Sequence, residues 1–197
     1  MLVGSTAPAF AEGFIDFYLG AAVTRDSAAR VSNPGFSDTQ RIDWDASVTS
    51  GGRFGFWFDS LEWMGLALDG SFFRPDRDLT VIPISALLML RVPLMKDKDF
   101  AHGRLQPYIG VGPSLFISRL SGGLGDLGGR ASDTSLDVGA DARGGVMFLL
   151  TKSIGIFGEY RFTHVEPAFK VDVLDVRFKT ETRLDTHHFL GGVSFRF

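Results

Sequence analysis

Charged side chains are the residues of this chain with the clearest capacity for chemistry, because they recur at regular positions within apolar stretches. Five acids and five arginines share this placement: Asp16, Arg53, Asp69, Arg91, Asp137, Asp141, Arg143, Glu159, Arg161 and Arg196. Guanidinium groups suit bidentate pairing with carboxylates, and charges removed from water need such partners. The pattern predicts a nearly neutral network of buried ion pairs, with the choice of partners left open.

Histidines and glycines supply the other candidate motifs, and each has a plain alternative. His187 and His188 are adjacent, so in a strand they point to opposite faces and make a poor metal site. Residues 123–128 spell G-x-G-x-x-G, but a dinucleotide fingerprint needs a strand before it and a helix after it. This Gly/Ser/Asp stretch has no helical period and is expected to be a flexible loop. The chain has no cysteine, and we expect no cofactor and no metal site.

The elements that carry the ten charges are eight segments in which apolar and polar residues alternate. They are residues 13–24, 48–58, 63–73, 81–92, 105–117, 136–148, 154–162 and 187–197. A period of two is typical of strands with one apolar and one polar face. All ten charges fall on the polar face, an outcome with odds of about one in a thousand if charge ignored strand parity. A charge that faces hydrocarbon costs about 2–4 kcal/mol at the bilayer midplane, which explains the segregation.

This alternation predicts an all-β fold, an eight-stranded antiparallel up-and-down transmembrane β-barrel with the charged face inside. No run approaches the ~18 apolar residues that a transmembrane helix requires, whereas barrel closure satisfies every backbone group between strands. The lumen of eight strands is narrow enough for side chains to fill, so a static plug of ion pairs is expected to close it. The net charge of −3 argues against a nucleic-acid partner.

The chain is expected to form a single domain over residues 12–197, preceded by the remnant of a secretory signal peptide at residues 1–11. Ala9-Phe10-Ala11 resembles an A-x-A cleavage site; the alternative is a short disordered leader. Long outer connections are expected at residues 25–47, 118–135 and 163–186, with a short one at 74–80. The connection at residues 163–186 still alternates in places, which predicts paired strands that project beyond the membrane.

Aromatic residues near the strand ends fit the interfacial girdles of membrane barrels. We assign Trp44, Trp57, Trp63 and Tyr160 to such girdles. The last segment alternates up to Phe195 and Phe197, so its apolar face ends on aromatic residues.

Several stretches carry a resemblance to a known family. They are Val81-Ile82-Pro83-Ile84-Ser85, Gln106-Pro107-Tyr108-Ile109-Gly110-Val111-Gly112, Glu159-Tyr160-Arg161-Phe162 and the terminal Phe197. With them, the chain from Gly13 onward resembles small outer-membrane barrels of the OmpA/OmpX type and the mostly uncharacterised "outer membrane beta-barrel protein" family. The resemblance implies a monomer in a bacterial outer membrane, in contact with lipid and lipopolysaccharide. It also implies that the barrel assembly machinery reads Phe195 and Phe197.

One barrel hosts many functions, and we expect a non-enzymatic, structural or surface-binding role with the long outer loops as the interaction surface. One alternative is a lipid A-modifying deacylase or acyltransferase. Lipid A deacylase barrels carry a His-x-Ser-Asn motif, and this chain reads His164-Val165-Glu166-Pro167, with Glu in the place of the nucleophile. A small gated pore is the other alternative, although eight strands leave little room for one.

Overall fold

The structure is a computed structural model of the 197-residue chain. It describes residues 12–25, 27–33, 36–42, 46–75, 79–124, 129–166, 168–173, 176–181 and 184–197. The expected signal remnant at residues 1–11 and the expected girdle residue Trp44 lie outside the described residues, as does most of the G-x-G-x-x-G stretch. Within the described residues, no helix is long and apolar enough to cross a membrane.

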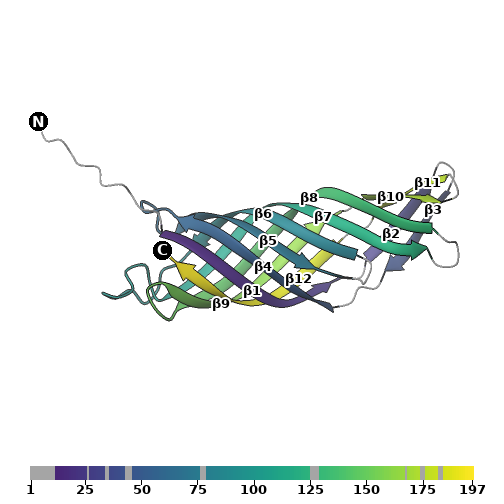
Figure 1. The fold of residues 1–197 in the computed structure, drawn as a ribbon. Helices are drawn as coiled ribbons and strands as arrows, with labels where there is room; N and C mark the ends of the chain where they lie inside the picture. The colour runs from purple at the N-terminus through teal and green to yellow at the C-terminus, as the bar shows by residue number, and fades with distance from the viewer. Residues whose placement is uncertain are drawn as a thin grey trace, which may run out of the picture.

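Eight strands close into a barrel in which every neighbour is antiparallel, as the alternation predicted (Figure 1). The strands are β1 (Glu12–Thr24), β4 (Ala46–Trp57), β5 (Met64–Phe73), β6 (Leu79–Arg91), β7 (Leu105–Leu124), β8 (Gly129–Leu149), β9 (Ile154–Val165) and β12 (Leu184–Arg196). Their order around the barrel is β1-β12-β9-β8-β7-β6-β5-β4, and β4 pairs with β1 to complete the ring. The up-and-down, all-β expectation is therefore confirmed.

We call the end of the barrel where β1 begins and β12 ends the terminal end, and the opposite end the loop end. At the loop end β7 and β8 continue as a paired ribbon well beyond the expected strand limits, from Ser118↔Ser135 to Leu124↔Gly129. Most of the connection expected at residues 118–135 is thus strand. The continued pairing satisfies backbone groups that a long loop would leave to water.

A second, four-stranded sheet lies at the loop end, where two connections meet (Figure 1). Its strands are β2 (Ser27–Asn33), β3 (Phe36–Ile42), β10 (Ala168–Val173) and β11 (Val176–Glu181), in the order β10-β11-β2-β3. The β10–β11 hairpin matches the paired strands expected in the last outer connection. The β2–β3 hairpin within residues 25–47 was not foreseen, nor was its pairing with β11 through Lys179↔Ser32.

Side chains alternate between the lumen and the exterior along the barrel strands. In β1, Asp16 is 1% exposed whereas its neighbour Phe17 is 58% exposed. The exterior carries exposed apolar side chains on every barrel strand. Such a surface suits hydrocarbon and would be costly in water.

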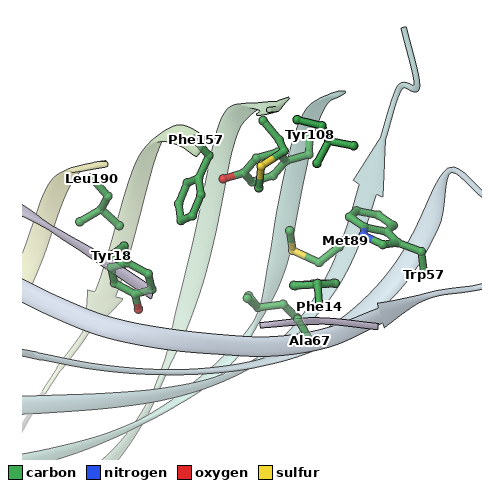
Figure 2. Close-up of a cluster of buried hydrophobic side chains, with 11 residues drawn as sticks. Phe14, Tyr18, Trp57, Ala67, Met89, Tyr108, Phe157 and Leu190 are labelled. Atoms are coloured by element: carbon green, nitrogen blue, oxygen red, sulfur yellow. The ribbon is translucent and has the colours of Figure 1, made fainter. Parts of the chain in front are cut away.

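The lumen is not purely polar, because apolar and aromatic side chains line its terminal half (Figure 2). This apolar cluster comprises Phe14, Tyr18, Trp57, Ala67, Leu87, Met89, Tyr108, Met147, Leu149, Phe157 and Leu190. Glycines make room for its tyrosine rings: a Cβ on Gly51 would lie 2.5 Å from the Tyr18 hydroxyl, and one on Gly145 would lie 2.7 Å from that of Tyr108.

Candidate functional site

The interior of the barrel holds the largest set of charged side chains that the structure brings together. Its central part contains four acids and three arginines from β1, β4, β5, β8 and β9. They are Asp16, Arg53, Asp69, Asp141, Arg143, Glu159 and Arg161, and we call them the central network. Each belongs to the set of ten that the sequence singled out.

Arg143 lies at the middle of the central network and contacts three acids. Its Nη1 donates to Asp69 Oδ2 at 2.8 Å, its Nη2 donates to Asp141 Oδ2 at 2.6 Å, and Nη1 lies 3.4 Å from Glu159 Oε1. Arg161 shares two of these acids, with Nη1 3.1 Å from Asp69 Oδ1 and Nη2 2.8 Å from Asp141 Oδ2. Two guanidinium groups thus bridge the same pair of carboxylates.

Arg53 connects Glu159 in β9 to Asp16 in the neighbouring strand β1. Its Nε donates to Asp16 Oδ2 at 2.8 Å and its Nη1 donates to Glu159 Oε2 at 2.7 Å. The acids also accept hydrogen bonds from two phenols: Tyr18 donates to Asp69 at 2.8 Å and Tyr108 donates to Glu159 at 2.7 Å. Neither tyrosine was among the predicted site residues, although both share the parity of the charged face.

Several of these contacts join strands that are not neighbours in the sheet. Arg53 in β4 reaches Glu159 in β9, and Arg143 in β8 reaches Asp69 in β5. Such pairs can meet only by crossing the lumen. The side chains of these two pairs are 0–1% exposed. The buried ion pairs therefore close the barrel.

A smaller network lies at the terminal end. Arg91 Nη2 donates to Glu12 Oε2 at 2.5 Å, and Arg196 Nη1 lies 3.4 Å from Glu12 Oε1. Glu12 was missed as a site residue because the first segment was expected to begin at Gly13. The sequence pattern does indicate it, since Glu12 is two residues before Phe14 and therefore shares the face of Phe14 and Asp16.

Asp137 is the one member of the predicted set that takes part in neither network. It is half-buried in β8 and accepts a hydrogen bond from Ser135 Oγ. With Glu12 counted in its place, the two networks contain five acids and five arginines, so the formal charges of the two networks balance.

The expectation of an interfacial girdle position for Trp57 is corrected by the structure. Trp57 is 3% exposed and lies inside the barrel, with the Arg91 guanidinium 4.3 Å from its ring centroid. Its parity is that of Arg53, so an inward position follows from the alternation itself. Trp63 and Tyr160 lie on the exterior, 49% and 42% exposed.

Three histidines lie near the loop end of β9 and β12. His164 Nδ1 is 2.5 Å from Asp185 Oδ1 on the barrel exterior, and His187 Nδ1 is 2.7 Å from the hydroxyl of Tyr160. His188 points into the lumen and is fully buried against Phe73, 5.0 Å between ring centroids. Among the described residues, no group of three or more His, Asp or Glu side chains is placed to hold a metal ion.

The last strand presents Phe195 and Phe197 to the exterior, 43% and 77% exposed. The backbone of Phe197 exchanges two hydrogen bonds with that of Gly13, which completes the seam between β12 and β1.

In the turn between β4 and β5, a hydrogen bond from Lys96 Nζ lowers the pKa of the Glu62 carboxyl.

Comparison with known proteins places this architecture among solved barrels. No family model matches the chain, and no curated protein matches it. Neisserial surface protein A superposes with a TM-score of 0.59 at 16% identity, over 94% of this chain and 97% of that one. OprG from Pseudomonas aeruginosa gives a TM-score of 0.74 at 14% identity, over 96% and 97%. The N-terminal β-barrel domain of Pseudomonas aeruginosa OprF gives 0.53 at 12% identity, over 94% and 97%. The likeness establishes the fold, that of the small bacterial outer-membrane β-barrels.

Proposed function

We propose that this chain, whose fold is that of the bacterial outer-membrane barrels, is a closed barrel with a structural or surface-binding role. The observation that supports this most strongly is the central network, whose buried ion pairs cross the lumen. A barrel closed in this way offers its loop end for interaction, and the four-stranded sheet of β2, β3, β10 and β11 is the largest structured element there. We assign surface binding to that sheet.

The membrane environment that we propose is inferred from the apolar exterior of the barrel. The barrel contacts outer-membrane lipid and lipopolysaccharide, works as a monomer, and carries the sheet outside the cell with its terminal end in the periplasm. Trp63 and Tyr160 serve as interfacial anchors. Phe195 and Phe197 present an aromatic end to the barrel assembly machinery.

Conductance measurements test the closed lumen. The purified protein in a planar bilayer is expected to give no steady ion current, because the cross-lumen pairs exclude water and ions. Replacing Arg53 and Glu159 together by alanine removes both members of one cross-lumen pair and leaves Asp16 without its arginine partner. This variant is expected to produce a measurable current. Lys152→Ala, which removes an exposed pair with Asp99, is the control and should leave the bilayer silent. A steady current from the unaltered protein would contradict the proposal.

An enzymatic role is the second candidate, and one contact favours it. The Asp185 carboxylate 2.5 Å from His164 Nδ1 would orient that imidazole as a general base on the lipid-facing side. The positions paired with His164 on the two neighbouring strands are Ala140 and Asp185, neither of which supplies a hydroxyl nucleophile. At these two paired positions, acyl transfer by a serine would have its base but no nucleophile.

Mass spectrometry of lipid A separates the two candidates. Outer membranes with and without the protein are expected to contain identical lipid A. A mass change of one acyl chain that disappears in His164→Ala would establish the enzyme and overturn the non-enzymatic proposal. A matched His187→Ala variant, which replaces a half-buried histidine two residues from Asp185, should behave as the unaltered protein does.

A further inference from the structure

Two arginines and a threonine form an outward-facing row at the loop end of β5, β6 and β7. Arg74 directly follows Phe73, which pairs with Val81; Thr80 precedes Val81 and pairs with Arg119. Both arginines are exposed, and Thr80 is half-buried. Adjacent strands lie about 4.8 Å apart, so the backbones of Arg74 and Arg119 are separated by about 10 Å across the row. Two long side chains can converge on one small group over that distance.

This row lies at the loop-end limit of the apolar exterior. The Arg74 guanidinium lies 5.2 Å from the ring centroid of Phe72, an outward-facing side chain at the end of the apolar exterior. Among the described residues, neither Arg74 nor Arg119 has a carboxylate partner. Two guanidinium groups and a hydroxyl are the donors that a phosphate monoester requires.

An apolar path descends from the row along β5. Below Phe72 the next outward position is Gly70, where an added Cβ would meet nothing within 4 Å. Leu68 follows, and there the exterior is hollowed into an apolar groove of about 380 Å³. The outward side chains that line it are Phe54, Phe56, Leu66, Leu68, Ala86 and Leu88. From Arg74 to Leu68 is six residues, or about 20 Å of strand, which is the scale of a lipid acyl chain.

We infer that Arg74, Thr80 and Arg119 bind the phosphate of a phosphorylated outer-leaflet glycolipid, and that one of its acyl chains runs over Gly70 into the groove at Leu68. The inference rests on the proposed outer-membrane setting and adds a specific lipid site to it. Charge complementarity identifies the headgroup, and the continuous apolar path identifies the acylated partner. The site lies on the exterior and does not involve the lumen.

Native mass spectrometry of the folded protein with bisphosphorylated lipid A tests the site. The double variant Arg74→Gln/Arg119→Gln is expected to weaken binding by about tenfold or more, since it removes two charge-assisted contacts. Arg25→Gln, at an exposed arginine that follows β1 and lies outside the row, is the matched control and should bind as the unaltered protein does. Gly70→Leu, at a position where an added Cβ would meet nothing within 4 Å, places a side chain in the apolar path and should also weaken binding of the acylated lipid. Equal heat-dependent gel mobility shows that each variant is folded.

Three results would overturn the inference. The first is unchanged binding by the double variant, and the second is an equal loss in Arg25→Gln. The third is unchanged binding by Gly70→Leu together with full competition by inorganic phosphate, which would mean that an anion alone occupies the row. Bilayer conductance on the same preparations keeps the two proposals apart. If the protein gives no ion current and the lipid-binding test fails, only this inference is contradicted. If the protein conducts ions and still binds lipid A through the row, only the closed lumen is contradicted.

Discussion

Replacing Arg143 by methionine is expected to lower the free energy of unfolding by about 3–5 kcal/mol, the usual cost of removing one partner from a buried ion-pair network. Methionine fills most of the space but leaves Asp69 and Asp141 with one guanidinium between them. Glu159 loses its contact with β8 and keeps that with Arg53. Urea titration of the protein folded in lipid vesicles, followed by heat-dependent gel mobility, measures the change.

The matched control is Lys152→Met in the turn between β8 and β9. Lys152 also forms an ion pair, 3.2 Å from Asp99, but these two side chains are 69% and 75% exposed. Exposed pairs contribute up to about 1 kcal/mol, so this variant should unfold close to the unaltered protein. If both variants had the same small effect, the central network would not be a dry, structural element of the lumen.

Placing an arginine on the exterior at Leu68 is expected to cost about 2–4 kcal/mol when the protein is folded in a bilayer. Leu68 is 46% exposed on the outward face of β5, in the middle of the apolar exterior. An arginine there must face hydrocarbon or bend its side chain toward an interface. The free energy of unfolding in vesicles, compared with that of the unaltered protein, gives the cost.

Depth within the membrane supplies the control for this second substitution. Val48 is 74% exposed near the loop end of β4, and an arginine near the interface costs about 0–1 kcal/mol. Val48→Arg should therefore be well tolerated. If Leu68→Arg and Val48→Arg lowered the free energy of unfolding equally, the bilayer midplane could not lie near Leu68.

The identity of the inward and outward faces was predictable because strand parity is local. A side chain two residues from Asp16 shares its face whatever the rest of the chain does. The same rule would have placed Glu12 and Trp57 in the lumen, had it been applied there in preference to the general location of aromatic girdles. The strand limits were less predictable, because β7 and β8 extend beyond the expected limits by pairing with each other.

The antiparallel barrel and the face on which each strand's charges lie follow from the sequence alone, because period-two alternation and the cost of a charge in hydrocarbon act on each strand separately. The pairing of Arg53 with Glu159 and of Arg143 with Asp69 depends on the closed barrel, since such partners face each other after the barrel has closed with a particular stagger. The same is true of the sheet that the first and last outer connections share. That contact joins segments well over a hundred residues apart, and they become neighbours because β1 and β12 meet at the seam.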